Sequence, residues 1–62
     1  MAYTKVKDLK VGDIYFDKGL TVNGDLINTE CKVISYNGMN KYVVENDGIT
    51  ILVDGEDVVS TK

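Results

Sequence analysis

The sequence has 62 residues, with 7 lysine plus arginine residues against 10 aspartate plus glutamate residues and a formal net charge of −3. All the cations are lysine, and histidine, proline and tryptophan are absent. This length supports one domain, and no apolar run reaches the roughly 20 residues of a membrane helix. Without histidine, imidazole catalysis and the usual Cys/His zinc site are excluded.

The single cysteine, Cys31, excludes an internal disulfide and fits a reducing compartment. Residues 1–5 lack the apolar stretch of a signal peptide, so we expect a cytoplasmic protein with no membrane association. A chain this short buries only about 60% of its unfolded surface, which makes support from a partner chain or from homo-oligomerisation plausible. We expect Cys31 to be a small buried apolar side chain.

The sequence predicts one helical turn followed by five strands. One helical turn over residues 5–9, capped by Thr4, precedes a first strand over residues 13–16. A polar, glycine-marked stretch then forms a long loop or an open hairpin over residues 17–25. Further strands are predicted over residues 26–36, 41–45, 49–53 and 57–60. The strand over residues 26–36 is so long that it must bend or bulge.

Turn dipeptides separate these strands. Each dipeptide suits a type I′ hairpin turn, in which both central residues have positive φ. They are Asn23-Gly24, Asn37-Gly38, Asp47-Gly48 and Asp54-Gly55. No window shows a convincing helical period, and 24 of the 62 residues are Val, Ile, Thr, Tyr or Phe, which prefer strands. The sequence therefore predicts an all-β fold.

Alternation predicts which side chains of the last long strands face inward. In the strand over residues 49–53, Ile49, Ile51 and Val53 share the inward face, while Leu52 is exposed or covers the end of a barrel. The strand over residues 41–45 has apolar side chains on both faces. Both faces of that strand should then be partly covered, as in a small barrel or a dimer interface.

The segment Leu9-Lys10-Val11-Gly12-Asp13-Ile14-Tyr15 resembles the L-x-V-G-D-x-hydrophobic opening of small SH3-like barrels, including KOW-type domains. Its glycine allows a tight bend, and its aspartate can accept backbone hydrogen bonds there. The resemblance implies one SH3-like domain over residues 1–62: a small antiparallel barrel or strongly twisted sheet of about five strands. KOW-type domains that bind RNA carry basic residues where this chain has Thr29-Glu30-Cys31-Lys32-Val33, so nucleic-acid binding is not carried over.

Charge is unevenly distributed along the chain. Residues 1–10 carry a net +2, and residues 45–57 carry −5. The acids of the second stretch are Glu45, Asp47, Asp54, Glu56 and Asp57. If neighbouring hairpins place these acids at adjoining turns, they form an acidic surface for a protein with a basic surface. A solvated face that aids solubility is the alternative interpretation. The residues 54–57 lack the spacing of an EF-hand, and no metal or cofactor is predicted.

Tyrosines are the other candidate binding residues. Tyr15 alternates with Ile14 and Phe16, so it is expected outside if those two are inside. Tyr36 and Tyr42 flank a turn and are expected to pair across the hairpin. These rings either form a small exposed binding platform or serve only for cross-strand packing.

The sequence therefore predicts a non-enzymatic protein-interaction module. Its predicted partner-binding residues are Tyr15, Tyr36, Tyr42, Glu45, Asp47, Asp54, Glu56 and Asp57. Lysine without arginine, together with many Asn and Ile residues, is typical of AT-rich genomes, including those of bacteriophages, where such a module would modulate a host protein. Two alternatives stay open: a nucleic-acid-associated SH3/KOW-like barrel, and an acidic nucleic-acid mimic that inhibits a DNA-binding protein.

Overall fold

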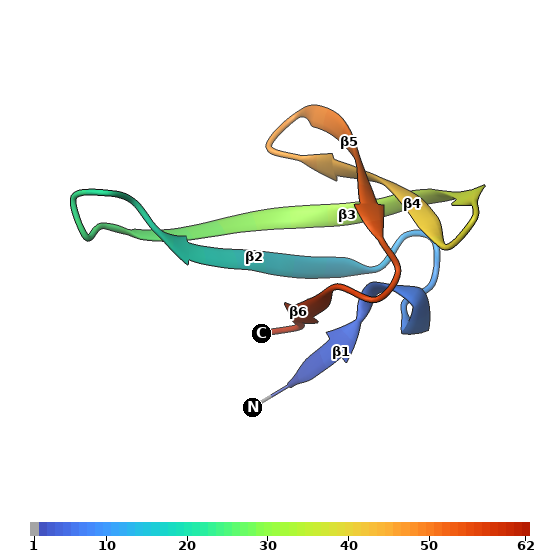
Figure 1. The fold of residues 1–62 in the computed structure, drawn as a ribbon, viewed down its shortest axis with the longest axis horizontal. Coiled ribbons are helices and arrows are strands. Elements are labelled where there is room, and N and C mark those ends of the chain that lie inside the picture. The colour runs from blue at the N-terminus through green and yellow to red at the C-terminus, as the bar shows by residue number, and fades with distance from the viewer. Residues whose placement is uncertain (1) are drawn as a thin grey trace.

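Six antiparallel strands form one sheet in the computed structural model, which describes residues 2–62 (Figure 1). The elements are β1 (Tyr3–Lys5), the 3-10 helix η1 (Val6–Asp8), β2 (Ile14–Leu20), β3 (Leu26–Gly38), β4 (Lys41–Asn46), β5 (Ile49–Asp54) and β6 (Val58–Ser60). The strand order is β1-β6-β2-β3-β4-β5, so β1 and β5 are the two edges. The predicted all-β twisted sheet is confirmed.

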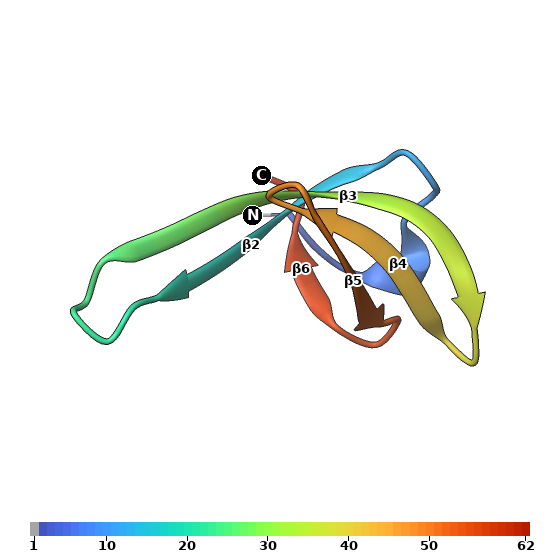
Figure 2. The same ribbon diagram turned by 90° about the horizontal axis from the view of Figure 1, so that it is seen from above.

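The sheet curls strongly but does not close into a barrel (Figure 2). Closure would require β5 to pair with a strand at the other edge. Instead, β4 is the only strand among residues 2–62 that pairs with β5. The loop after β5 leads into β6, which pairs with β1 and, at one position, with β2. The barrel that the SH3-like resemblance implied is therefore not formed, and one strand, β1, was not predicted.

The hairpin of β2 and β3 extends away from the other strands as an arm, which we define as residues 17–30 (Figure 1). Its pairing continues to Leu20 opposite Leu26, so the open hairpin is the correct alternative for residues 17–25. The accessible surface is 4386 Å², compared with about 4,000 Å² for a compact monomer of this mass. The arm is one reason for the larger surface, because it projects beyond the rest of the sheet.

The core lies on the inner face of the curled sheet. Its buried apolar residues are Val6, Tyr15, Cys31, Val33 and Val44. The expected burial of Cys31 is confirmed. The prediction that Tyr15 faces outward is wrong, because its side chain is only 3% exposed. Its register partner is Cys31, so alternation places Ile14 and Phe16 on the outer face.

The structure contains the predicted bulge in β3, but only some of the predicted type I′ turns. The long strand bulges, with register shifts between Val33 and Ser35 and between Tyr36 and Gly38. The β4–β5 turn has positive φ at Asp47 and Gly48 (51° and 81°), as a type I′ turn requires. The β3–β4 turn lies two residues later than predicted, at Met39 and Asn40.

The N-terminal segment forms the predicted helical turn as η1, but without its predicted cap. Thr4 belongs to β1, and its hydroxyl donates to the carbonyl oxygen of Lys5 at 3.3 Å. The bend before β2 forms as expected: Gly12 has φ 96°, and the Asp13 carboxylate accepts the Lys10 N–H at 2.8 Å. Within residues 2–62, no helix has the length and apolar character to cross a membrane.

Candidate functional site

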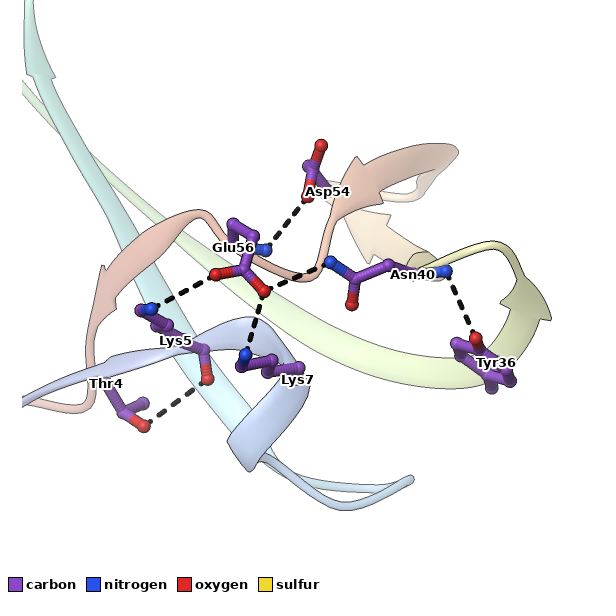
Figure 3. Close-up of polar contacts among 7 residues, drawn as sticks. All are labelled: Thr4, Lys5, Lys7, Tyr36, Asn40, Asp54 and Glu56. Atoms are coloured by element: carbon purple, nitrogen blue, oxygen red, sulfur yellow. Dashed lines mark hydrogen bonds and ion pairs between the residues drawn. The ribbon is translucent and has the colours of Figure 1, made fainter.

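Glu56, in the β5–β6 loop, is held by three side chains from two other segments (Figure 3). Its carboxylate lies 3.0 Å from Lys5 Nζ, 2.9 Å from Lys7 Nζ and 3.1 Å from Asn40 Nδ2. Lys7, then Lys5, then Asn40 lower the pKa of Glu56 to about 2. In turn, the hydrogen bond and the charge of Glu56 raise the pKa of Lys7. Glu56 is thus a clamp between the loop, the N-terminal segment and the β3–β4 turn.

Asp54, at the end of β5, is also paired within the chain. Its carboxylate accepts the Glu56 backbone N–H at 2.9 Å and lies 3.1 Å from Lys41 Nζ. The Glu56 backbone N–H, followed by the Lys41 ammonium, lowers the pKa of Asp54. Two of the five predicted partner-binding acids therefore already have positive partners.

Asp57 follows Asp54 and Glu56 in the connection to β6, but Asp47 and Glu45 lie apart from these three acids. Asp47 lies in the β4–β5 turn, at the opposite end of β5. A strand of this length separates the two turns by about 17–20 Å. Glu45 lies on the outer face of β4, opposite Lys32 and Thr50. The acids were expected at adjoining turns, but the turns are at the two ends of one hairpin.

Tyr36 and Tyr42 pair across the β3–β4 hairpin, as predicted. Their ring centroids are 4.9 Å apart and the rings are tilted by 57°. The Tyr36 hydroxyl also accepts the Asn40 backbone N–H at 3.1 Å. Tyr36 is exposed, so the pair combines a structural contact with a face open to solvent.

A hollow of about 220 Å³ lies between β5 on one side and β2, β6 and η1 on the other. We call it the edge hollow. Its lining residues are Val6, Tyr15, Asp17, Asn46, Ile51, Val53, Asp57, Val58 and Val59. The Asp17 and Asp57 carboxylates take part in no hydrogen bond or ion pair within residues 2–62. The edge hollow therefore combines aliphatic side chains with polar groups, two of which are unpaired carboxylates.

Sequence reasoning missed the edge hollow, although one of its residues, Asp57, was a predicted partner-binding residue. The inward face of β5 was predicted, and Val53 on that face packs against the core. Ile51 on the same face remains 38% exposed, because no strand closes the sheet over it. The open edge of β5 was not predictable from the sequence, because it depends on the path of the β5–β6 loop, which takes the chain to the other side of the sheet.

Tyr15 of β2 and Cys31 of β3 are register partners, and both side chains lie on the buried inner face of the sheet. Burial, then the neighbouring Cys31, raises the pKa of the Tyr15 phenol, and Asp17 and Asp57 raise it further. Burial also raises the pKa of the Cys31 thiol. Both groups therefore favour their neutral forms, which suits packing rather than nucleophilic attack.

A second hollow, of about 460 Å³, lies on the arm. It is lined by Lys18, Gly19, Leu20, Leu26, Ile27 and Asn28. Gly19 has no side chain opposite Ile27, which leaves the apolar side chain uncovered. The Lys18 ammonium turns toward the body and donates to the Lys62 main-chain oxygen at 2.6 Å.

The described part of the chain, residues 2–62, contains no group of three or more His, Cys, Asp or Glu side chains placed to hold a metal ion. Comparisons with protein-family models, with curated proteins and with solved structures gave no match.

Proposed function

We propose that this protein is a non-enzymatic interaction module that docks on another protein through exposed apolar surface and a free sheet edge. The observation that supports the proposal is the ratio of exposed to buried apolar side chains. Within residues 2–62, five apolar residues are buried, while fourteen large ones are exposed. Three of these, Leu20, Leu26 and Ile27, line one hollow on the arm, and contiguous exposed apolar surface is typical of a contact site.

The free edges favour a protein as the partner. An edge strand presents unpaired backbone N–H and C=O groups, which pair readily with a strand from another chain. The edge hollow, at about 220 Å³, is smaller than the roughly 300–1,000 Å³ of typical small-molecule pockets. Side chains of a protein segment fit it better than a whole cofactor or metabolite would.

The two nucleic-acid alternatives have less support. Binding to nucleic acid would require free cations, but Lys5 and Lys7 pair with Glu56, and Tyr15 is buried. Mimicry of nucleic acid would require a row of free acids, but Asp54 and Glu56 have lysine partners. A protein-interaction role needs only the apolar side chains and strand edges that the fold leaves exposed.

Three further features support a fold relationship, a location and an origin for such a module. The bend at Gly12 and Asp13 and the long β2–β3 hairpin support a distant relationship to SH3-like domains, opened along one side. The lone buried thiol supports a cytoplasmic location. The lysine-rich, arginine-free composition supports a phage accessory protein that acts on a host protein. The neighbourhood of its gene would test that origin.

Affinity capture tests the interaction itself. The immobilised protein is incubated with lysate of the cells in which it is made, and retained proteins are identified with and without excess free protein as competitor. We expect at least one retained protein that the free competitor displaces. If every retained protein resists competition, or none is retained across low and physiological salt, the interaction proposal is wrong.

A further inference from the structure

Resting on the proposed function, we propose that the edge hollow and the free edge of β5 together bind an extended segment of another protein. The segment adds to β5 as a further strand, places alternate apolar side chains in the hollow, and carries a lysine or arginine that meets Asp17 and Asp57. The backbone edge, the aliphatic side chains in the walls and the charge each support this occupant.

The outer edge of β5 is open to a further strand. Of the described strands, only β4 pairs with β5, and alternate residues of β5 direct their N–H and C=O groups away from β4. An added strand would lie about 4.8 Å from β5. Because Ile51 and Val53 of β5 form one wall of the hollow and Val58 and Val59 of β6 form the opposite wall, that strand would run over the hollow.

The aliphatic part of the lining fits aliphatic side chains. The hollow of about 220 Å³ equals the share of about seven water molecules in the liquid. Its walls include Ile51, Val53, Val58 and Val59, and Ile51 and Val58 are exposed. Side chains of a strand alternate between its two faces, so every second residue of the bound segment would enter the hollow. Covering Ile51 and Val58 removes apolar surface from water.

The charge selects a basic segment. Asp17 and Asp57 line the hollow, and their carboxylates have no ion-pair partner among residues 2–62. The nearby lysines are engaged elsewhere: Lys5 and Lys7 with Glu56, and Lys18 with the Lys62 main-chain oxygen. A cation from the partner would therefore complete the site, and a net charge of −3 favours its approach. An acidic segment would be repelled.

Synthetic peptides test the site directly. The probe is Ac-Thr-Val-Thr-Val-Thr-Lys-Thr-NH2, in which valine and lysine share one face, and its control replaces lysine with glutamate. Binding is followed by backbone amide shifts in two-dimensional NMR. We expect the lysine peptide to shift the amides of Thr50, Ile51, Val58 and Val59, and to bind at least about 5-fold more tightly than the glutamate peptide.

Matched variants locate the contacts. Asp57→Lys should weaken binding of the lysine peptide by about 5- to 10-fold, while Asp47→Lys, with the same change in net charge at the other end of β5, should leave it within about 2-fold. Ile51→Ser should weaken binding by about 10-fold. Leu52→Ser, on the opposite face of the same strand, should have little effect. Circular dichroism of each variant verifies folding.

The outcomes separate this inference from the proposed function. Absence of peptide binding, shifts confined to the arm or the outer face, or equal affinity for the lysine and glutamate peptides would overturn the edge site. If the competed lysate partner is still captured in that case, the protein remains an interaction module that uses another surface. Equal effects of Asp57→Lys and Asp47→Lys would show only general electrostatics and would also overturn the site.

Discussion

Gly55 lies directly against Asn40. The Gly55 backbone N–H donates to the Asn40 carbonyl oxygen at 2.7 Å, and a Cβ on Gly55 would fall on the Asn40 side-chain amide. The Gly55 carbonyl oxygen also accepts the Lys7 N–H at 3.0 Å. The missing side chain at this position therefore lets three segments meet: the β3–β4 turn, the β5–β6 loop and η1.

Gly55→Ala should destabilise the protein. The new Cβ would overlap the Asn40 amide and lie 3.0 Å from Cε1 of Tyr42, so the Asn40 side chain, which donates to Glu56, would have to shift. We expect the free energy of unfolding, measured by urea denaturation, to fall by about 1–3 kcal/mol. Gly19→Ala is the control, because a Cβ there meets no atom within 4 Å. Equal losses in the two variants would contradict a packing role for Gly55.

Glu56 should make stability depend on pH in the acid range. Its pKa is lowered to about 2 from an ordinary 4.5, so the unfolded chain binds more protons between these values. Its contribution is complete above about pH 5 and is lost as the pH falls toward 2. We expect Glu56→Gln to reduce stability at pH 7, with the difference from the unchanged protein vanishing near pH 2.

Urea denaturation between pH 2 and pH 7 measures this difference. The control is Glu30→Gln, because Glu30 takes part in no ion pair within residues 2–62. Added salt should reduce the Glu56 effect, since both partners are half-exposed. A pH profile of Glu56→Gln that runs parallel to that of the unchanged protein would rule out the clamp.

Local chemistry made much of the fold predictable. Glycine and asparagine or aspartate mark the turns, and β-branched residues mark the strands, so β3, β4 and β5 were found within two residues at each end. The orientation of β2 was not predictable in this way. Ile14, Tyr15 and Phe16 are all large and apolar, so alternation alone cannot tell which face is buried; pairing of Tyr15 with Cys31 decides it.

The candidate site was less predictable, because it depends on contacts between distant segments. Glu56 pairs with Lys5 and Lys7, which are about fifty residues away in the sequence, so the pairing could not be predicted. The carboxylate predicted to bind a partner therefore links segments of this chain instead. Asp17 was predicted to lie in a long loop or an open hairpin, with no role in binding, yet it belongs to β2 and lines the edge hollow, as Asp57 does. The pairing of Tyr36 with Tyr42 was predicted, because it follows from one hairpin alone.

The Tyr36–Tyr42 pair should stabilise the β3–β4 hairpin in two separable ways. Tyr36→Phe keeps the ring but removes the hydroxyl that accepts the Asn40 N–H, and should cost about 0.5–1.5 kcal/mol. Tyr36→Leu also removes the ring contact, and should cost a further 0.5–1.5 kcal/mol or so. A double-mutant cycle with Tyr42→Leu measures the ring term. A coupling energy near zero would mean that the rings contribute only as separate apolar surfaces.

Cys31 should react with thiol reagents only when the protein opens. Its side chain is 1% exposed, and burial raises the pKa of the thiol, so both access and the thiolate form are disfavoured in the folded state. We expect labelling by a disulfide reagent such as DTNB in native buffer to be about 100-fold slower or more than in guanidinium chloride. If the thiol is reached by global unfolding, Gly55→Ala should accelerate native labelling about tenfold for each 1.4 kcal/mol of stability that it loses. Native labelling as fast as that of the denatured chain would show that β2 and β3 separate readily around Tyr15 and Cys31.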